Sequence, residues 1–198
     1  MTDDWYRVVA SGVLIATTGI SIGYRARAEL RGGAAPDQSR GDLPRPARFV
    51  AGATIWGAML LPLLAPALTD WARIPLPDPV RVVGVALGLL GVPAMWWTMR
   101  SLGTNVSHTT GTRAGASLVT HGPYRWVRHP LYTTGLNLFL ASALMLESGI
   151  QLVVFLVVAL WIPSRAAREE EYLIASYGQR YQDYQRRSGR FLPRIIRR

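Results

Sequence analysis

Residues 130–164 read PLYTTGLNLFLASALMLESGIQLVVFLVVALWIPS, two runs of 17 uncharged residues on either side of Glu147. A helix that crosses the hydrocarbon core of a bilayer needs roughly 20 apolar residues, within a working range of about 17–25. Each run is long enough for one crossing, and the Glu-Ser-Gly sequence between them favours a turn. The stretch therefore predicts a membrane-embedded helical hairpin with Glu147 at its outer end.

Three more uncharged runs precede the hairpin, at residues 8–24, 49–69 and 82–99. Because a soluble domain rarely contains so many unbroken apolar runs, the sequence predicts an all-α integral membrane protein with about five transmembrane helices. The length of 198 residues suits one domain of ordinary size. Within this single membrane domain, residues 1–100 are expected to hold spans one to three, and residues 101–198 the connecting loop, the hairpin and a C-terminal cytoplasmic helix.

The positive charges lie mostly on one side of the predicted spans. The net charge of +10 involves no lysine, and 19 of the 22 arginines lie in residues 25–48, 100–130 and 164–198. The positive-inside rule puts these segments in the cytoplasm and the N-terminus outside, as five spans require. We therefore expect a multi-pass protein of the plasma membrane. The arginines lack the interleaved aromatics of a nucleic-acid surface, so membrane lipids rather than nucleic acid are the expected surroundings.

The two ends of the chain carry further signals. Asp3 and Asp4 precede the first span, where a cleavable signal peptide carries positive charge, so this span is expected to be retained. Beyond Arg165 the spacing of arginines and tyrosines predicts a helix that continues from span five, breaks near Gly178 and ends before Gly189. The chain contains no cysteine, which excludes disulfides and thiolate metal ligands, and no metal site is predicted.

Polar residues at the start of the hairpin are candidates for chemistry. In the stretch RHPLY at 128–132, Pro130 suits the first turn of a helix, where its missing N–H costs nothing. His129 then lies at a helix N-terminus, whose free N–H groups and partial positive charge favour a carboxylate. A single interfacial histidine is more often a structural hydrogen-bonding group. The glycines of the preceding loop either admit a ligand close to the backbone or mark a flexible connector: Gly103, Gly111, Gly115 and Gly122.

A second polar group follows span five. Arg165 and Glu169 are four residues apart and so share one face of a helix, with Glu170 beside them. Two interpretations stay open from the residues alone. The glutamates form either a solvated acidic patch that pairs with nearby arginines, or a site for a cationic ligand at the membrane surface.

Together these elements resemble a known family. The sequences LVTHGPYRWVRHPLY (118–132) and RAAREEEYLIASYGQRYQDYQRRSGRFLP (165–193) are similar to those of the isoprenylcysteine carboxyl methyltransferases, relatives of the phospholipid N-methyltransferases. The resemblance covers roughly residues 100–195. Where the family usually has glycine two residues after the motif tyrosine, this chain has Thr134, followed by Gly135. The matching positions are Gly122-Pro123-Tyr124, Arg128-His129-Pro130 with Tyr132, Arg165 with Glu169-Glu170, Tyr177-Gly178, Tyr181, Tyr184, and Arg190-Phe191 with Pro193.

The resemblance implies an enzyme that uses S-adenosyl-L-methionine to methylate a lipophilic substrate at a carboxylate, an amine or a thiol. Glu169 or Glu170 would hold a cationic or amide part of the cofactor, and backbone N–H groups around Gly122 and His129 would hold its carboxylate. Arg165 is expected to dock the substrate, with Glu170 as the second catalytic residue. The expected cofactor contacts are Leu118, Val119, Gly122, Tyr124, His129, Pro130, Tyr132, Glu169 and Glu170.

Two other functions stay open. Membrane sterol or enone reductases that use NADPH share a similar Arg-His-Pro-x-Tyr region, but they usually follow it with a stretch that carries Asp, His or Cys. This chain has Glu169-Glu170 there and no cysteine, which favours the methyltransferase. The third possibility is a non-catalytic membrane scaffold or sensor that retains the pocket. The methyl acceptor is not readable, although the absence of lysine hints at a GC-rich bacterial genome and makes a prenylated protein a less favoured substrate.

Overall fold

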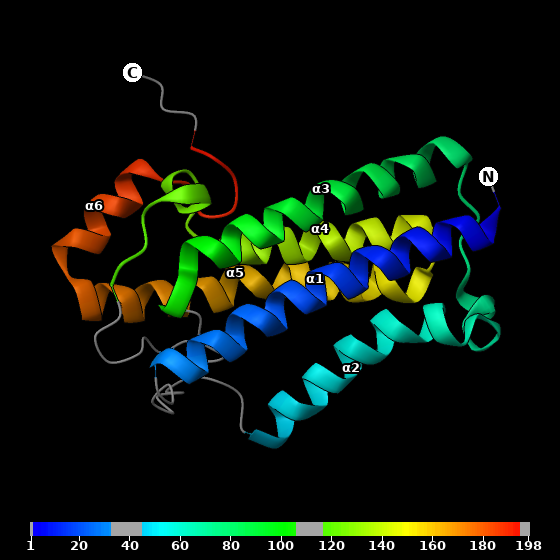
Figure 1. Ribbon diagram of the computed structural model, residues 1–198, viewed down its shortest axis with the longest axis horizontal. Coiled ribbons are helices and arrows are strands. Elements are labelled where there is room, and N and C mark those ends of the chain that lie inside the picture. The colour runs from blue at the N-terminus through cyan, green and yellow to red at the C-terminus, as the bar shows by residue number, and fades with distance from the viewer. Residues whose placement is uncertain (1, 33–44, 106–116, 195–198) are drawn as a thin grey trace. The chain divides into compact units, whose positions relative to one another are not determined.

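The computed structural model describes residues 2–32, 45–105 and 117–194, which form helices and connecting turns and contain no β-strand. Short 3-10 turns, η1 to η4, lie between the longer helices. Figure 1 shows the α-helices of the described residues, labelled in chain order. They are α1 (Asp3–Gly32), α2 (Arg45–Leu64), α3 (Asp78–Leu102), α4 (Pro130–Met145), α5 (Gly149–Tyr177) and α6 (Gln179–Arg187).

A helix lies at each of the five predicted spans, but the helices differ in length. Helices α1, α3 and α5 are long and apolar enough to cross a membrane, which supports an all-α membrane protein. The apolar part of α2 is shorter, and α4 has 16 residues. At about 1.5 Å per residue α4 extends about 24 Å, less than the roughly 30 Å of a bilayer core. Three spans are therefore supported, and the count of five stays a prediction.

Two helix ends differ from expectation. The connector predicted at 25–48 is helical at both ends, because α1 continues to Gly32 and α2 already begins at Arg45. The second span ends at Leu64 rather than at residue 69. Ala65 leaves the helical region, with φ −138° and ψ 64°, because the residue before a proline is disfavoured there. Pro66 then opens the 3-10 turn η1 (Pro66–Leu68).

The chain divides into two compact units, each built from three separate segments. The first comprises Met1–Thr17, Leu43–Pro93 and Gly135–Trp161. The second comprises Thr18–Asp42, Ala94–Thr134 and Ile162–Arg198. The hairpin turn lies in the first unit, and the polar motifs at residues 118–134 and 165–193 lie in the second.

The glycines of α3 permit close packing in the first unit, as their spacing on one helix face predicts. A Cβ at Gly84 would lie 2.9 Å from Leu144 Cβ, and one at Gly91 would lie 2.6 Å from a Leu138 methyl. A side chain at either position would therefore push α4 away from α3. The buried cluster of this unit consists of Tyr6, Ala10, Ala141 and Met145.

The hairpin turn is fixed by charged groups. Glu147 is the only non-glycine residue of the described chain with positive φ, 53°, and it is buried. Its carboxylate accepts hydrogen bonds from Arg73 Nε at 2.7 Å and from the Leu76 N–H at 2.8 Å. The buried Arg81 donates to the Met145 carbonyl at 3.1 Å and to Asp3 at 2.8 Å. Glu147 and Arg81 are both buried, and these contacts compensate their charges, because an unpaired charge is costly to bury.

Candidate functional site

The turn that leads to α4 is the first component of the site. Gly122 opens the 3-10 turn η4 (Gly122–Arg125) with φ 60°, and a Cβ there would lie 2.1 Å from the Ser101 hydroxyl oxygen, so glycine is required. The carbonyl of the buried Tyr124 accepts a hydrogen bond of 2.6 Å from the Tyr184 hydroxyl. Burial raises the pKa of Tyr184 to about 12, so its hydroxyl stays protonated and donates at neutral pH. The turn is thereby tied to α6.

A C-terminal strap, residues 188–191, follows α6 and runs parallel to residues 126–129. The His129 N–H, one of the donors expected near the ligand carboxylate, donates to the Arg190 carbonyl in this structure. The backbone bonds of the strap are Gly189 N to Trp126 O at 2.9 Å, Arg128 N to Gly189 O at 2.8 Å and His129 N to Arg190 O at 3.1 Å.

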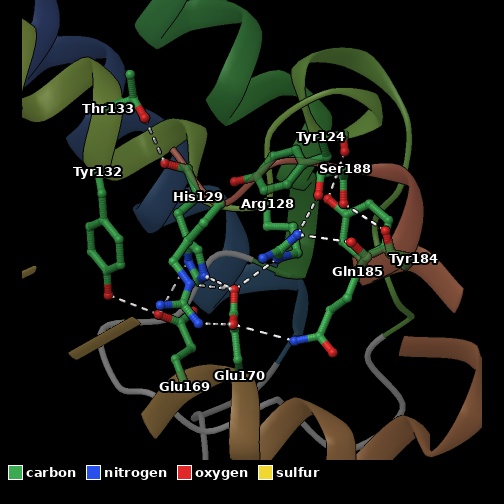
Figure 2. Close-up of polar contacts among 11 residues, drawn as sticks. Tyr124, Arg128, His129, Tyr132, Thr133, Glu169, Glu170, Tyr184, Gln185 and Ser188 are labelled. Atoms are coloured by element: carbon green, nitrogen blue, oxygen red, sulfur yellow. Dashed lines mark hydrogen bonds and ion pairs between the residues drawn. The ribbon is translucent and has the colours of Figure 1, made fainter. Parts of the chain in front are cut away.

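Glu170 lies at the centre of the site and is only 3% exposed (Figure 2). Its Oε1 contacts Arg128 Nε at 2.8 Å, His129 Nε2 at 3.2 Å and Arg190 Nε at 3.3 Å. Its Oε2 accepts hydrogen bonds from Arg190 Nη2 at 2.7 Å and Gln185 Nε2 at 3.3 Å. Both carboxylate oxygens are therefore fully used, and two guanidinium groups compensate the buried charge.

Arg128, Gln185 and Arg190 contact Glu170 but are not among the residues expected to bind the cofactor or the substrate. Arg128 Nη1 also donates to the carbonyls of Gln185, at 3.2 Å, and Ser188, so its guanidinium caps the end of α6. The signal that could have found these residues is the burial of Glu170. A buried carboxylate needs cationic partners, and Arg128 and Arg190 belong to the same sequence motifs.

A second chain of contacts runs through Tyr132, whose hydroxyl points toward Glu169 in Figure 2. The Tyr132 hydroxyl donates to Glu169 Oε2 at 2.8 Å and accepts from Arg165 Nε at 2.9 Å. The His129 ring stacks on the Tyr132 ring, with centroids 5.4 Å apart and an interplanar angle of 17°. Unlike Glu170, Glu169 keeps a side chain that is 28% exposed. It is the carboxylate of this pair that a ligand could reach without breaking the buried network.

The structure brings the two predicted polar groups together. His129 directly precedes α4, and Tyr132 lies in its first turn. Arg165, Glu169 and Glu170 lie on α5, and hydrogen bonds join these residues to His129 and Tyr132. The solvated-patch interpretation therefore does not describe Glu170, whose side chain is buried. The predicted residues that meet are His129, Tyr132, Arg165, Glu169 and Glu170.

The remaining predicted residues have other positions. Pro130 is buried and begins α4, as expected from its missing N–H. Leu118 and Val119 are half-buried in the segment before η4, which has no regular secondary structure. Gly103 has φ 55° in the turn after α3. Gly111 and Gly115 lie outside the described residues.

Comparisons with known proteins place these residues in a family context. A family model described as phospholipid methyltransferase matches residues 80–180, about half of the chain. The protein-S-isoprenylcysteine O-methyltransferase of Saccharomyces cerevisiae is 32% identical over 118 residues, which are 58% of this chain and 49% of that protein. Methanethiol S-methyltransferase 2 of Bradyrhizobium diazoefficiens is 33% identical over 156 residues, which are 71% of this chain and 60% of that protein. The chain spans about half the length of the curated relatives it matches.

A solved structure shares the fold. The eukaryotic intramembrane Ras methyltransferase, an isoprenylcysteine carboxyl methyltransferase, matches with a TM-score of 0.56 at 21% identity. The match covers 94% of this chain and 68% of that chain. These findings confirm the resemblance to the isoprenylcysteine carboxyl methyltransferases that the sequence motifs indicate.

Proposed function

The chain belongs to the phospholipid methyltransferase family, and we propose that it is a membrane enzyme that transfers a methyl group from S-adenosyl-L-methionine to a lipophilic substrate. The observation that carries the proposal is the convergence of the Arg-His-Pro-x-Tyr motif and the Arg165–Glu170 segment on one buried network. Helices long and apolar enough to cross a bilayer support a substrate that enters from the membrane.

The residues present suit this cofactor. S-adenosyl-L-methionine carries a sulfonium, an ammonium and a carboxylate, so its site needs hydrogen-bond acceptors as well as donors. Glu169 offers a partly exposed acceptor, and the buried hydroxyl of Tyr181 has unused hydrogen-bonding capacity among the described residues. When bound, the cofactor supplies an activated methyl group. We infer that Glu169, His129 and Tyr132 contact it, and that Gly122, Tyr124, Pro130, Leu118 and Val119 shape the surrounding backbone.

Glu170 and Arg165 have different proposed tasks. Because both oxygens of Glu170 are occupied, we assign it a positioning role: it holds the His129 ring and two guanidinium groups in place. Arg165 cannot act as a base, because a guanidinium does not deprotonate in a protein. It can dock an anionic acceptor and hold the Tyr132 hydroxyl toward Glu169. Alignment of the two reactants and exclusion of water then supply most of the rate.

The membrane orientation and the acceptor are further parts of the proposal. The 19 arginines that lie in three segments support a plasma-membrane protein with its N-terminus outside and its site on the cytoplasmic side. The names of the relatives include both O- and S-methyltransferases, which supports a carboxylate or a thiol as acceptor. An amine would need a base to remove its proton, and the proposed roles leave no residue for that task.

The experiment combines binding with a product search. Protein purified in detergent should bind S-adenosyl-L-methionine, measured by calorimetry, and should not bind NADPH. Incubation with membrane lipid extract and methyl-labelled cofactor should then give a labelled lipophilic product by mass spectrometry. Binding of NADPH instead would support the reductase alternative. Cofactor binding without transfer to any component of the extract would support a scaffold or sensor.

A further inference from the structure

Tyr181 carries a buried hydroxyl that nothing in the described chain satisfies. It lies in the first turn of α6, its side chain is 1% exposed, and its oxygen has no hydrogen-bond partner among the residues that the structure describes. A buried polar group without a partner is costly, and native proteins retain few of them. Phenylalanine would fill the same space without this cost. The hydroxyl therefore points to a partner that is a ligand.

Tyr184 provides an internal comparison. The two rings are neighbours on α6, with centroids 5.8 Å apart in an edge-to-face arrangement, and both are buried. Yet the Tyr184 hydroxyl donates to the Tyr124 carbonyl at 2.6 Å, so this part of the fold readily satisfies one tyrosine. Of these two neighbouring tyrosines, only Tyr181 has a hydroxyl without a hydrogen-bond partner among the described residues.

The charges around Tyr181 indicate which kind of ligand group could form a hydrogen bond with its hydroxyl. Burial raises the pKa of Tyr181, with a smaller contribution from the Glu170 carboxylate and an opposing one from Arg128, so the hydroxyl stays protonated and can donate. Arg190 also lies within electrostatic range of it. The two guanidinium groups balance the carboxylates of Glu170 and Glu169, both of which lie within electrostatic range of the Tyr181 hydroxyl. Because both Glu170 oxygens are already used and guanidinium groups only donate, the uncommitted capacity favours an anionic acceptor.

One member of the charged group near Tyr181 is accessible to solvent. The side chain of Arg190 is 40% exposed, whereas those of Arg128 and Glu170 are 11% and 4% exposed. Arg190 is therefore the solvent-facing member of this group, and it belongs to the strap, residues 188–191. The backbone carbonyl of the same residue accepts the His129 N–H, so Arg190 connects the solvent-facing edge of the group to the start of α4.

We propose that the Tyr181 hydroxyl donates a hydrogen bond to the carboxylate of the bound ligand, on the cationic side of the site formed by Arg128 and Arg190. This inference rests on the proposed function, in which that carboxylate belongs to S-adenosyl-L-methionine. It assigns Tyr181 as a ligand-binding residue in addition to the cofactor contacts expected from the sequence. It also explains why a polar tyrosine is retained at a position that the ligand-free fold leaves unsatisfied.

The test compares Tyr181→Phe with Tyr184→Phe in the full-length protein in detergent, using S-adenosyl-L-methionine and its decarboxylated analogue as probes. Tyr181→Phe should weaken binding of S-adenosyl-L-methionine roughly tenfold, the size expected for a hydrogen bond to a charged group. It should leave affinity for the decarboxylated analogue unchanged. Its ligand-free unfolding temperature should be equal or higher, because an unsatisfied hydroxyl is removed. Tyr184→Phe should instead lower the unfolding temperature, because the Tyr124 carbonyl loses its donor.

Two results would overturn the inference: unchanged affinity for S-adenosyl-L-methionine, or an equal loss of affinity for both probes. Unchanged affinity can also be accompanied by a lower unfolding temperature of Tyr181→Phe. That combination would show that a buried water satisfies the hydroxyl. If the folded wild-type protein binds neither probe, the proposed function fails as well. If the wild type binds and Tyr181→Phe binds equally well, only the role of Tyr181 fails.

Discussion

Glu170 is the residue on which most of the site depends, and its charge can be removed without changing its size. In Glu170→Gln, Arg128 and Arg190 lose their shared counterion in a buried place. Breaking a buried pair typically costs about 3–5 kcal/mol, and the partial exposure of Arg190 argues for the lower end. We expect the free energy of unfolding to fall by about 3 kcal/mol and cofactor affinity to fall with it, measured by denaturant titration in detergent and by calorimetry.

Glu171→Gln is the matched control for this change. Glu171 is the next residue of α5 and is exposed. The same loss of one carboxylate there should change stability by less than about 0.5 kcal/mol. Equal effects of the two substitutions would mean that Glu170 contributes only through the net charge of the helix.

Arg165→Lys tests the proposed docking role. The Arg165 guanidinium donates to the Tyr132 hydroxyl at 2.9 Å, and lysine keeps the charge while losing the planar set of donors. An interaction that matters in the aligned complex should affect turnover more than binding. We expect kcat to fall at least tenfold, with cofactor affinity changed less than twofold, once an acceptor is known. Arg180→Lys, at an exposed position of α6, should leave both unchanged. Near-normal turnover of Arg165→Lys would show that Arg165 does not dock the substrate and contributes only its positive charge to the membrane orientation.

The sequence predicts which residues form the candidate site better than it predicts the contacts among them. Pro130 marks a helix start, which locates His129 and Tyr132, and a spacing of four joins Arg165 to Glu169. The full occupation of Glu170 could not be foreseen in this way. Gln185 and Arg190 reach it only because Gly178, with φ 57°, ends α5 and lets the chain turn into α6. The direction of the chain after that turn is a tertiary property that local patterns do not encode.

At the scale of elements, backbone hydrogen bonds hold the strap against residues 126–129. A single added methyl group at Gly189 is therefore expected to displace it. A Cβ at Gly189 would lie 1.8 Å from the Leu192 carbonyl oxygen, a contact that only a shift of the backbone relieves. Gly189→Ala should displace the strap and remove the acceptors of the Arg128 and His129 N–H groups. We expect a lower unfolding temperature and at least tenfold weaker cofactor binding.

Gly135→Ala serves as the comparison for the strap variant. Gly135 lies inside α4, and a Cβ there meets nothing within 4 Å. Because alanine is the better helix former, this change should stabilise the protein by about 0.5–1 kcal/mol. Wild-type cofactor affinity in Gly189→Ala would show that the strap does not shape the site.

The positions of the helices could be predicted more reliably than their ends. Uncharged runs located a helix at each of the five predicted spans, since apolar length is the dominant signal in a membrane protein. Their ends were less readable. Residues 25–32 carry arginines, alanines and a glutamate, which form helix well in or out of a membrane, so α1 extends beyond its apolar run. The end of α2 depends on Pro66 and on the backbone of Ala65 before it, whereas the other proline, Pro62, is accommodated within the helix.

At the scale of the whole molecule, the family match and the topology rest on different parts of the chain. The match covers residues 80–180 and leaves the first two spans outside it. The orientation is instead argued from all 22 arginines, of which only three lie in segments assigned to the outer side, at positions 7, 73 and 81. Two of these, Arg73 and Arg81, pair with Asp3 and Glu147, so they add little uncompensated positive charge to that side.

The orientation can be tested with reporters at the two ends of the chain. An odd number of spans puts the ends on opposite sides, and the arginine bias places the C-terminal end in the cytoplasm. A reporter fused after Arg198 should therefore be active only as a cytoplasmic protein, and one fused before Met1 only as an external protein. Both ends on one side would require an even number of spans. The shorter helices α2 and α4 are the candidates for failing to cross, and a glycosylation or cysteine-accessibility site in the turn at residues 70–76 would then identify which of them does not span.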